Sequence, residues 1–167
     1  INHRVLRYAS AAALSNGAAA EAVLGQAGFT GNREATTQTG MNRPASVAVD
    51  KFGRLWVADT RNNRVLRFDN AASKNNGDPA DGVLGQPNFT SQASAATQSG
   101  MNAPLSVAVD MDGRLWVADS GNNRVLRFDD ALFKDDGANA DGVLGQPNFI
   151  SKAAATTQSG LNSPSGL

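Results

Sequence analysis

The 167 residues suffice to bury the core of a single domain, and 15 Lys and Arg balance 15 Asp and Glu. Balanced charge provides no strong net field for nucleic acid, an anionic membrane or an acidic substrate. The lack of cysteine excludes disulfides, thiolate nucleophiles and cysteine-ligated zinc.

No apolar run reaches the roughly 20 residues that cross a bilayer, so we expect no membrane span. The chain starts at Ile1, inside a repeat and without an initiator Met. We therefore expect the natural N-terminus, with any targeting signal, to lie outside this sequence.

A repeat of 60 residues organises the chain. The sequence GRLWVAD begins at Gly53 and again at Gly113, and VLGQPNF begins at Val83 and again at Val143. The same offset extends backward without insertion or deletion, which gives two complete and two partial units. A fixed period of this kind indicates stacked supersecondary units.

Each complete unit predicts four short strands separated by turn residues. In the second complete unit they are residues 106–110, 115–118, 124–128 and 142–146. In chain order we expect strands three and four of one blade at 1–29, an inter-blade loop at 30–45, a full blade at 46–89, a second loop at 90–105, a second full blade at 106–149, and a third loop with the start of another blade at 150–167.

Four antiparallel strands per unit, some of them apolar on both faces, predict an all-β propeller in which neighbouring blades cover each other. A parallel β-helix is the rival fold, but it uses a shorter coil and needs no hairpin turns here. The loops repeat Thr-Gln-(Thr or Ser)-Gly at a fixed offset. We expect them to be ordered and packed on the blade edge, with a solvated spacer as the alternative.

The turn Asp-(Thr or Ser)-x-Asn-x-Arg between strands two and three occurs at residues 59–64 and 119–124. With the surrounding Asn-x-Pro, Ser-Val-Ala-Val-Asp and Leu-Trp-Val-Ala sequences, it resembles the NHL-repeat family. The resemblance covers the whole chain, although the unit is longer than is usual for that family. It implies a six-bladed propeller, of which this chain would supply about two full blades and two part-blades.

Such a chain cannot close a ring alone. We expect a fragment of a longer protein or, as the less favoured alternative, copies that associate to complete a ring. The missing blades would come from the same longer chain or from another copy.

The turn acids could suggest a metal or catalytic site, but each precedes an Arg by five residues. A carboxylate there can accept turn N–H groups and pair with the guanidinium. We therefore predict a structural turn built from Asp59, Asn62, Arg64, Asp119, Asn122 and Arg124.

No catalytic residue is predicted, because Thr60 and Ser120 lack a His and Asp at a recognisable spacing. Calcium at Asp50 and Asp110 is the one cofactor left open, although no calcium-loop motif is present. His3 aligns with Asn63 and Asn123 and is interpreted as a turn residue.

Residues that differ between copies are the candidates for a unique contact surface, because the repeated ones are explained by blade geometry. They fall in turns and loops, where recognition residues concentrate. The candidate partner contacts are Arg33, Glu34, Lys51, Phe52, Arg61, Met111, Asp112, Leu132 and Phe133.

We expect a non-catalytic binding or scaffold module for a protein or small ligand. Nucleic acid is disfavoured, because acids flank the arginines of strand three. One alternative is part of a metal-dependent, lyase-like or lactonase-like propeller enzyme whose catalytic residues lie in other blades. Another is a subunit of an extracellular assembly. Low charge, no cysteine and polar loops lead us to expect an extracellular or cell-envelope protein of bacterial type.

Overall fold

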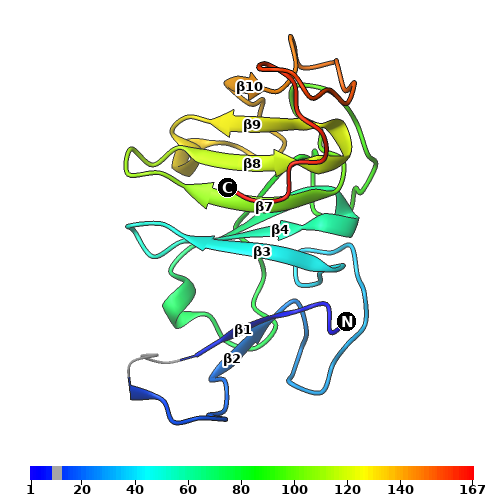
Figure 1. Cartoon of the computed structure of the whole chain (residues 1–167). Helices are drawn as coiled ribbons and strands as arrows, with labels where there is room; N and C mark the ends of the chain where they lie inside the picture. The colour runs from blue at the N-terminus through cyan, green and yellow to red at the C-terminus, as the bar shows by residue number, and fades with distance from the viewer. Residues whose placement is uncertain (9–12) are drawn as a thin grey trace.

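Three antiparallel sheets follow one another in the computed structural model, which describes residues 1–8 and 13–167 (Figure 1). The first sheet is two-stranded and the other two are four-stranded. The strands are β1 (Val5–Arg7), β2 (Ala22–Leu24), β3 (Pro44–Val49), β4 (Leu55–Asp59), β5 (Arg64–Phe68), β6 (Gly82–Leu84), β7 (Pro104–Val109), β8 (Leu115–Asp119), β9 (Arg124–Phe128) and β10 (Gly142–Leu144).

The four-stranded sheets are meanders in which each strand pairs with its neighbour in sequence. Short 3-10 turns follow the second and third strands of each: η2 (Thr60–Asn62), η3 (Ala71–Ser73), η4 (Ser120–Asn122) and η5 (Ala131–Phe133). The described residues are therefore all-β apart from single helical turns, as expected. None of their helices is long and apolar enough to cross a membrane.

In the third sheet four strand ends differ from the prediction: Val109 and Asp119 by one residue, and Pro104 and Leu144 by two. The first strand of the third sheet starts at Pro104 rather than at residue 106, because Pro104 pairs with Asp119 across a register shift. The last strand ends at Leu144 rather than at residue 146, because Gly145 adopts a φ of 83° that breaks the extended backbone. The third strand has the predicted bounds.

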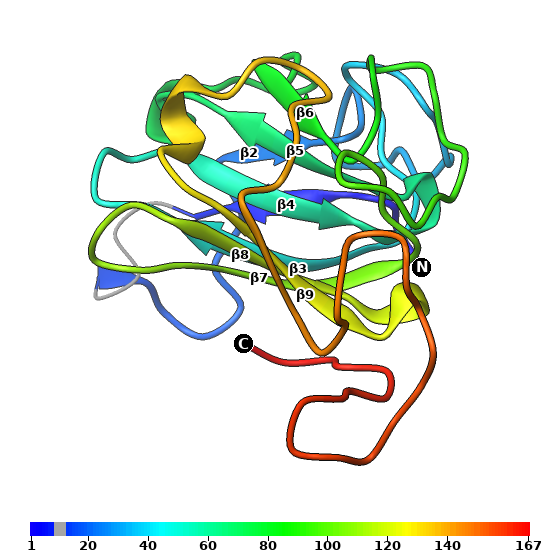
Figure 2. The same ribbon diagram turned by 90° about the horizontal axis from the view of Figure 1, so that it is seen from above.

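The sheets pack face to face, as Figures 1 and 2 show from two directions. Trp56 and Leu84 of the second sheet share one core with Leu115 and Phe128 of the third. A second core joins Leu24 of the first sheet to Leu66 and Phe68 of the second. Burying a side chain of this size contributes roughly 1.5–3 kcal/mol, so the interfaces between sheets are the main source of stability.

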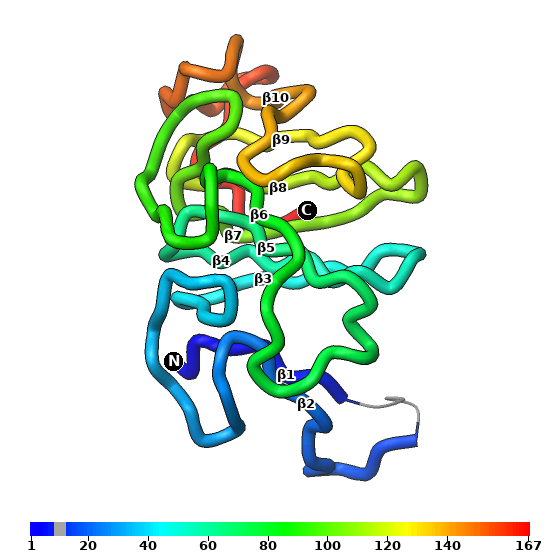
Figure 3. Tube along the Cα trace, turned by 180° about the vertical axis from the view of Figure 1, so that it is seen from behind, coloured from blue at the N-terminus to red at the C-terminus, as the bar shows by residue number. Residues whose placement is uncertain are grey.

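The loops after β2 and β6 lie on the same side of the molecule (Figure 3). Each is held by a backbone hydrogen bond, from Ala35 N–H to Met41 O and from Ala95 N–H to Met101 O, both at 3.1 Å. Met41 and Met101 are fully buried. These two loops are therefore packed on the sheets.

Candidate functional site

The repeated Asp and Arg of the turn form a fully buried ion pair. Arg64 Nε donates to Asp59 Oδ2 at 2.7 Å, and neither side chain is exposed to solvent. The other guanidinium nitrogens donate to the carbonyl oxygens of Phe89 at 2.6 Å, and of Thr37 and Gly40 at 2.9 Å. Arg64 therefore connects its own sheet to the loop that precedes it, and to the segment that follows β6.

The second carboxylate oxygen is also occupied. Asp59 Oδ1 accepts the Asn42 N–H at 2.7 Å, and Oδ2 also accepts from Asn62 Nδ2 at 2.8 Å. The backbone donor therefore comes from the preceding loop, whereas we had expected it from the turn itself. Burial raises the pKa of Asp59, and the Arg64 charge opposes that rise.

The third sheet repeats this arrangement with Asp119, Asn122 and Arg124. Arg124 Nε donates to Asp119 Oδ2 at 2.6 Å, and Asn102 N–H donates to Oδ1 at 2.6 Å. The carboxylate oxygens and guanidinium nitrogens of both pairs are thus engaged in hydrogen bonds within the fold.

A left-handed residue follows each turn. The φ angles are 48° at His3, 53° at Asn63 and 54° at Asn123, a region that Asn tolerates better than most residues. Each side chain accepts a backbone N–H 40 residues later: His3 Nδ1 from Arg43, and Asn63 Oδ1 from Ala103. His3 is thus the turn residue that the alignment of copies predicted.

The hairpin between β3 and β4 is held by Asp50. Its Oδ1 accepts the N–H groups of Phe52 and Arg54 at 2.9 and 3.1 Å. Its Oδ2 accepts Arg54 Nε at 2.7 Å and Trp56 Nε1 at 3.3 Å. Although burial opposes ionisation, these bonds hold the pKa of Asp50 below its ordinary value.

Asp110 has the same role in the hairpin between β7 and β8. Hydrogen bonds from Arg114 and Trp116 hold the pKa of that carboxyl well below its ordinary value. Both acids are thus engaged within their own hairpins. Among residues 1–8 and 13–167, no group of three or more His, Cys, Asp and Glu side chains could hold a metal ion.

The repeated turn and strands correspond to a known family. The family model of the NHL repeat matches residues 41–68 and 101–128, which cover the loop end, the first three strands and the turn of each complete unit. The chain therefore contains two NHL repeats. A search of curated proteins finds no match to it.

Consecutive NHL repeats are joined along the outer edge of each sheet. Val83 N–H donates to Asp136 Oδ1, and Gly137 N–H donates to Val83 O, both at 2.9 Å. One repeat earlier, Val23 makes the same two bonds to Asn76 and Gly77, at 3.0 and 2.9 Å. The next repeat thereby covers an edge strand that would otherwise be open to pairing.

Two further contacts recur across this boundary. Gln98 and Ala140 exchange bonds, from Gln98 Nε2 to Ala140 O at 2.8 Å and from Ala140 N–H to Gln98 O at 2.9 Å. The guanidinium of Arg67 donates to Leu132 O at 3.3 Å. We use the name repeat joint for all of these contacts. It includes the bonds of Val83 to the next repeat and the bonds of Arg64 to the loop that precedes its sheet. Sequence reasoning missed the joint, although Asn16-Gly17, Asn76-Gly77 and Asp136-Gly137 recur with the 60-residue period.

The residues that differ between repeats do not form one patch. Lys51 and Met111 come together, with Lys51 Nζ 3.3 Å from Met111 O, and Phe52 and Asp112 adjoin them in the same two hairpins. Arg61 lies in η2, which follows β4 at the end of the sheet opposite the hairpin between β3 and β4. The remaining candidates lie elsewhere: Arg33 and Glu34 in the first loop, and Leu132 and Phe133 in η5.

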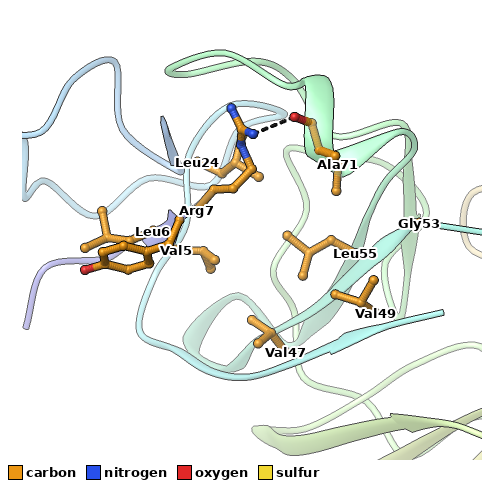
Figure 4. A pocket seen from close by; sticks show the side chains of 11 residues that line it. Val5, Leu6, Arg7, Leu24, Val47, Val49, Gly53, Leu55 and Ala71 are labelled. Carbon is orange, nitrogen blue, oxygen red and sulfur yellow. Dashed lines mark hydrogen bonds between the residues drawn. The ribbon is translucent and has the colours of Figure 1, made fainter. Parts of the chain in front are cut away.

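An apolar groove of about 530 Å³ lies between β1 and β3 (Figure 4). Its wall includes Val47 and Val49, which are 51% and 65% exposed. Val107, one repeat after Val47, is only 5% exposed because it packs against the second sheet. The groove therefore lies where the first repeat lacks counterparts of β3 and β4.

Proposed function

We propose that the chain is part of a β-propeller, with these sheets as blades, and that it serves as a non-catalytic binding or scaffold module for proteins. Support comes from the two NHL repeats and from the face-to-face packing of their sheets. The six-bladed ring implied by the resemblance is part of this proposal, as is an extracellular or cell-envelope location.

The contact surface in this proposal is the pair of hairpin turns at residues 50–54 and 110–114, which we call the hairpin end. Phe52 and Met111 are 59% and 92% exposed there, on backbones fixed by Asp50 and Asp110. Because the turn backbones are already fixed, binding costs little backbone entropy there, and exposed apolar groups mark interaction sites.

A shallow groove of about 450 Å³ runs between these hairpins, lined by Val49, Lys51, Val109 and Met111 with the two acids. Lys51 Nζ lies 5.3 Å from the centre of the Phe52 ring. The surface thus offers apolar contacts beside a cation, which suits a peptide segment with an apolar anchor and an acidic neighbour.

Selection of a displayed random peptide library against the chain tests this function. We expect peptides whose binding is lost in the Phe52→Ser, Met111→Ser double variant and kept in an Arg61→Ser control. Arg61 is also exposed but lies at the opposite end of the sheet. If the selected peptides bound both variants equally, the hairpin end would not be the contact surface.

A further inference from the structure

Two arginines of the first complete repeat lie close together at the end of the sheet opposite the hairpin end. Arg43 comes directly before β3, and Arg61 lies in η2. Their backbones adjoin, because the Arg61 N–H donates to the carbonyl oxygen of Asn42 at 3.0 Å. The same positions in the second complete repeat hold Ala103 and Gly121. The repeat therefore does not require a positive charge at either position.

The side chains of both arginines are exposed and uncommitted. Among residues 1–8 and 13–167, neither guanidinium pairs with a carboxylate. Their hydrogen bonds use the backbone instead, as in the bond from Arg43 N–H to His3 Nδ1 at 3.1 Å. Arg54 and Arg64, in contrast, each pair with an Asp. Two positive charges are thus available to a ligand.

Both arginines line an open concavity of about 400 Å³, a volume within the range of small-ligand sites, roughly 300–1,000 Å³. The other residues that line it are Ile1, Pro44, Ala45, Thr60 and Leu105. Only Thr60 among these five has a polar side chain, and its hydroxyl already donates to the carbonyl oxygen of Pro104 at 2.8 Å. The concavity therefore combines two cations with an apolar wall.

Arg61 occupies its position at a cost to the fold. In the second repeat, Asn102 Nδ2 donates to Gly121 O at 3.2 Å, and a Cβ on Gly121 would lie 2.6 Å from the Asn102 side chain. A side chain at this position is incompatible with that arrangement. In the part of the chain that the structure describes, the counterpart Asn42 has a buried Oδ1 without a hydrogen-bond partner. An unpaired buried polar atom is unfavourable, and such local costs concentrate at functional sites.

We propose that Arg43 and Arg61 form a binding site for a small carboxylate ligand with an apolar group next to the acid. A guanidinium donates two parallel hydrogen bonds to a planar carboxylate, which makes arginine the preferred residue for this group. Pro44 and Leu105 provide the apolar surface beside the two cations. The site lies at the opposite end of the sheet from the hairpin end and does not depend on the binding function proposed for it.

A nucleic acid suits this concavity less well than a carboxylate does. Single strands are held by bases that stack on aromatic side chains, and none of the described residues that line the concavity is aromatic. The apolar wall also gives no hydrogen bonds to a sugar. A carboxylate with an aliphatic group uses both the cations and the wall.

Titration of the purified chain with N-acetyl-leucine, followed by two-dimensional NMR, tests the ligand class. We expect the N–H signals of Arg43, Arg61 and Leu105 to shift. N-acetyl-leucine amide should bind at least about tenfold more weakly, because it keeps the apolar group but lacks the charge. Inorganic phosphate should also bind more weakly, because it leaves the apolar wall uncovered. No binding of the acid, or equal binding of the amide or of phosphate, would overturn the proposal.

Two variants test the residues. Arg43→Ala and Arg61→Gly each introduce the residue of the second repeat, so both should fold, and each should weaken binding of the acid by about tenfold. Arg33→Ala is the matched control. It also removes an exposed positive charge and introduces the residue of the second repeat, but Arg33 does not line the concavity. An equal loss of affinity in this control would assign binding to overall charge and overturn the proposal.

Two further chains separate this site from its surroundings. The Phe52→Ser, Met111→Ser double variant should bind N-acetyl-leucine as the wild type does, so that a failure of the hairpin end leaves this result unaffected. Acetylation of the Ile1 amine removes a positive charge near the concavity and should leave the affinity unchanged. Loss of binding on acetylation would mean that the terminal amine, not the two arginines, holds the carboxylate.

Discussion

Arg64 and Asp59 form a buried ion pair, 2.7 Å between Nε and Oδ2, that ties the third strand of the sheet to the second. The same pair recurs at Arg124 and Asp119. A guanidinium left without its carboxylate in such a place is costly, because no water reaches it. The pair therefore explains why this turn recurs in both complete units.

Replacement of Asp119 by Ala should lower the free energy of unfolding by about 3–5 kcal/mol, because Arg124 would become an uncompensated buried charge. Urea denaturation measures the loss. Glu21→Ala is the control, since its pair with Arg7 is 46% and 29% exposed and should contribute about 1 kcal/mol or less. Equal losses of unfolding free energy in the two variants would show that burial does not make the Asp119 pair more stabilising than an exposed pair.

Substitution of Gly137 by Ala should cost more than the same change at Gly113. Both residues have positive φ, at 70° and 83°, so the backbone strain is similar. A Cβ at Gly137 would lie 2.9 Å from Pro87 Cα, whereas one at Gly113 meets nothing within 4 Å. The difference in melting temperature between the two variants measures how closely the repeats pack at the repeat joint. Equal melting temperatures would contradict close packing there.

Asp110 should make stability depend on pH in the acidic range. Its pKa is lowered by Arg114 and Trp116 from an ordinary value of 3.8, so the native state binds fewer protons than the unfolded state. Its contribution is then complete above pH 3.8 and declines as the pH falls further. The difference in free energy of unfolding between wild type and Asp110→Asn should be largest near neutral pH. It should shrink as the pH falls below 3.8. A difference independent of pH would contradict this.

Much of the fold could be predicted because the repeat presents each element in several copies, which can be compared. The predictions for the third strand and for His3 as a turn residue were correct for that reason. Strand ends failed where tertiary pairing decides them, as at Pro104, which reaches Asp119 through a register shift.

The site was only partly predictable. The pairing of Asp59 with Arg64 follows from sequence spacing, whereas the Asn42 donor lies 17 residues away and depends on how the loop folds back. The repeat joint connects residues 54 apart, Val83 and Gly137. Its sequence signals were an Asn-Gly or Asp-Gly pair and the Gln of the Thr-Gln loop motif, both of which recur with the common period.

Successive repeats cover each other along their edges, and amide hydrogen exchange at low protein concentration can measure this cover residue by residue. The N–H groups of Val83 and Gly137 should be protected, because each is bonded across the joint. Those of Val143 and Gly17, at the uncovered ends, should exchange rapidly. Exchange at Gly137 as fast as at Gly17 would contradict the stacked arrangement.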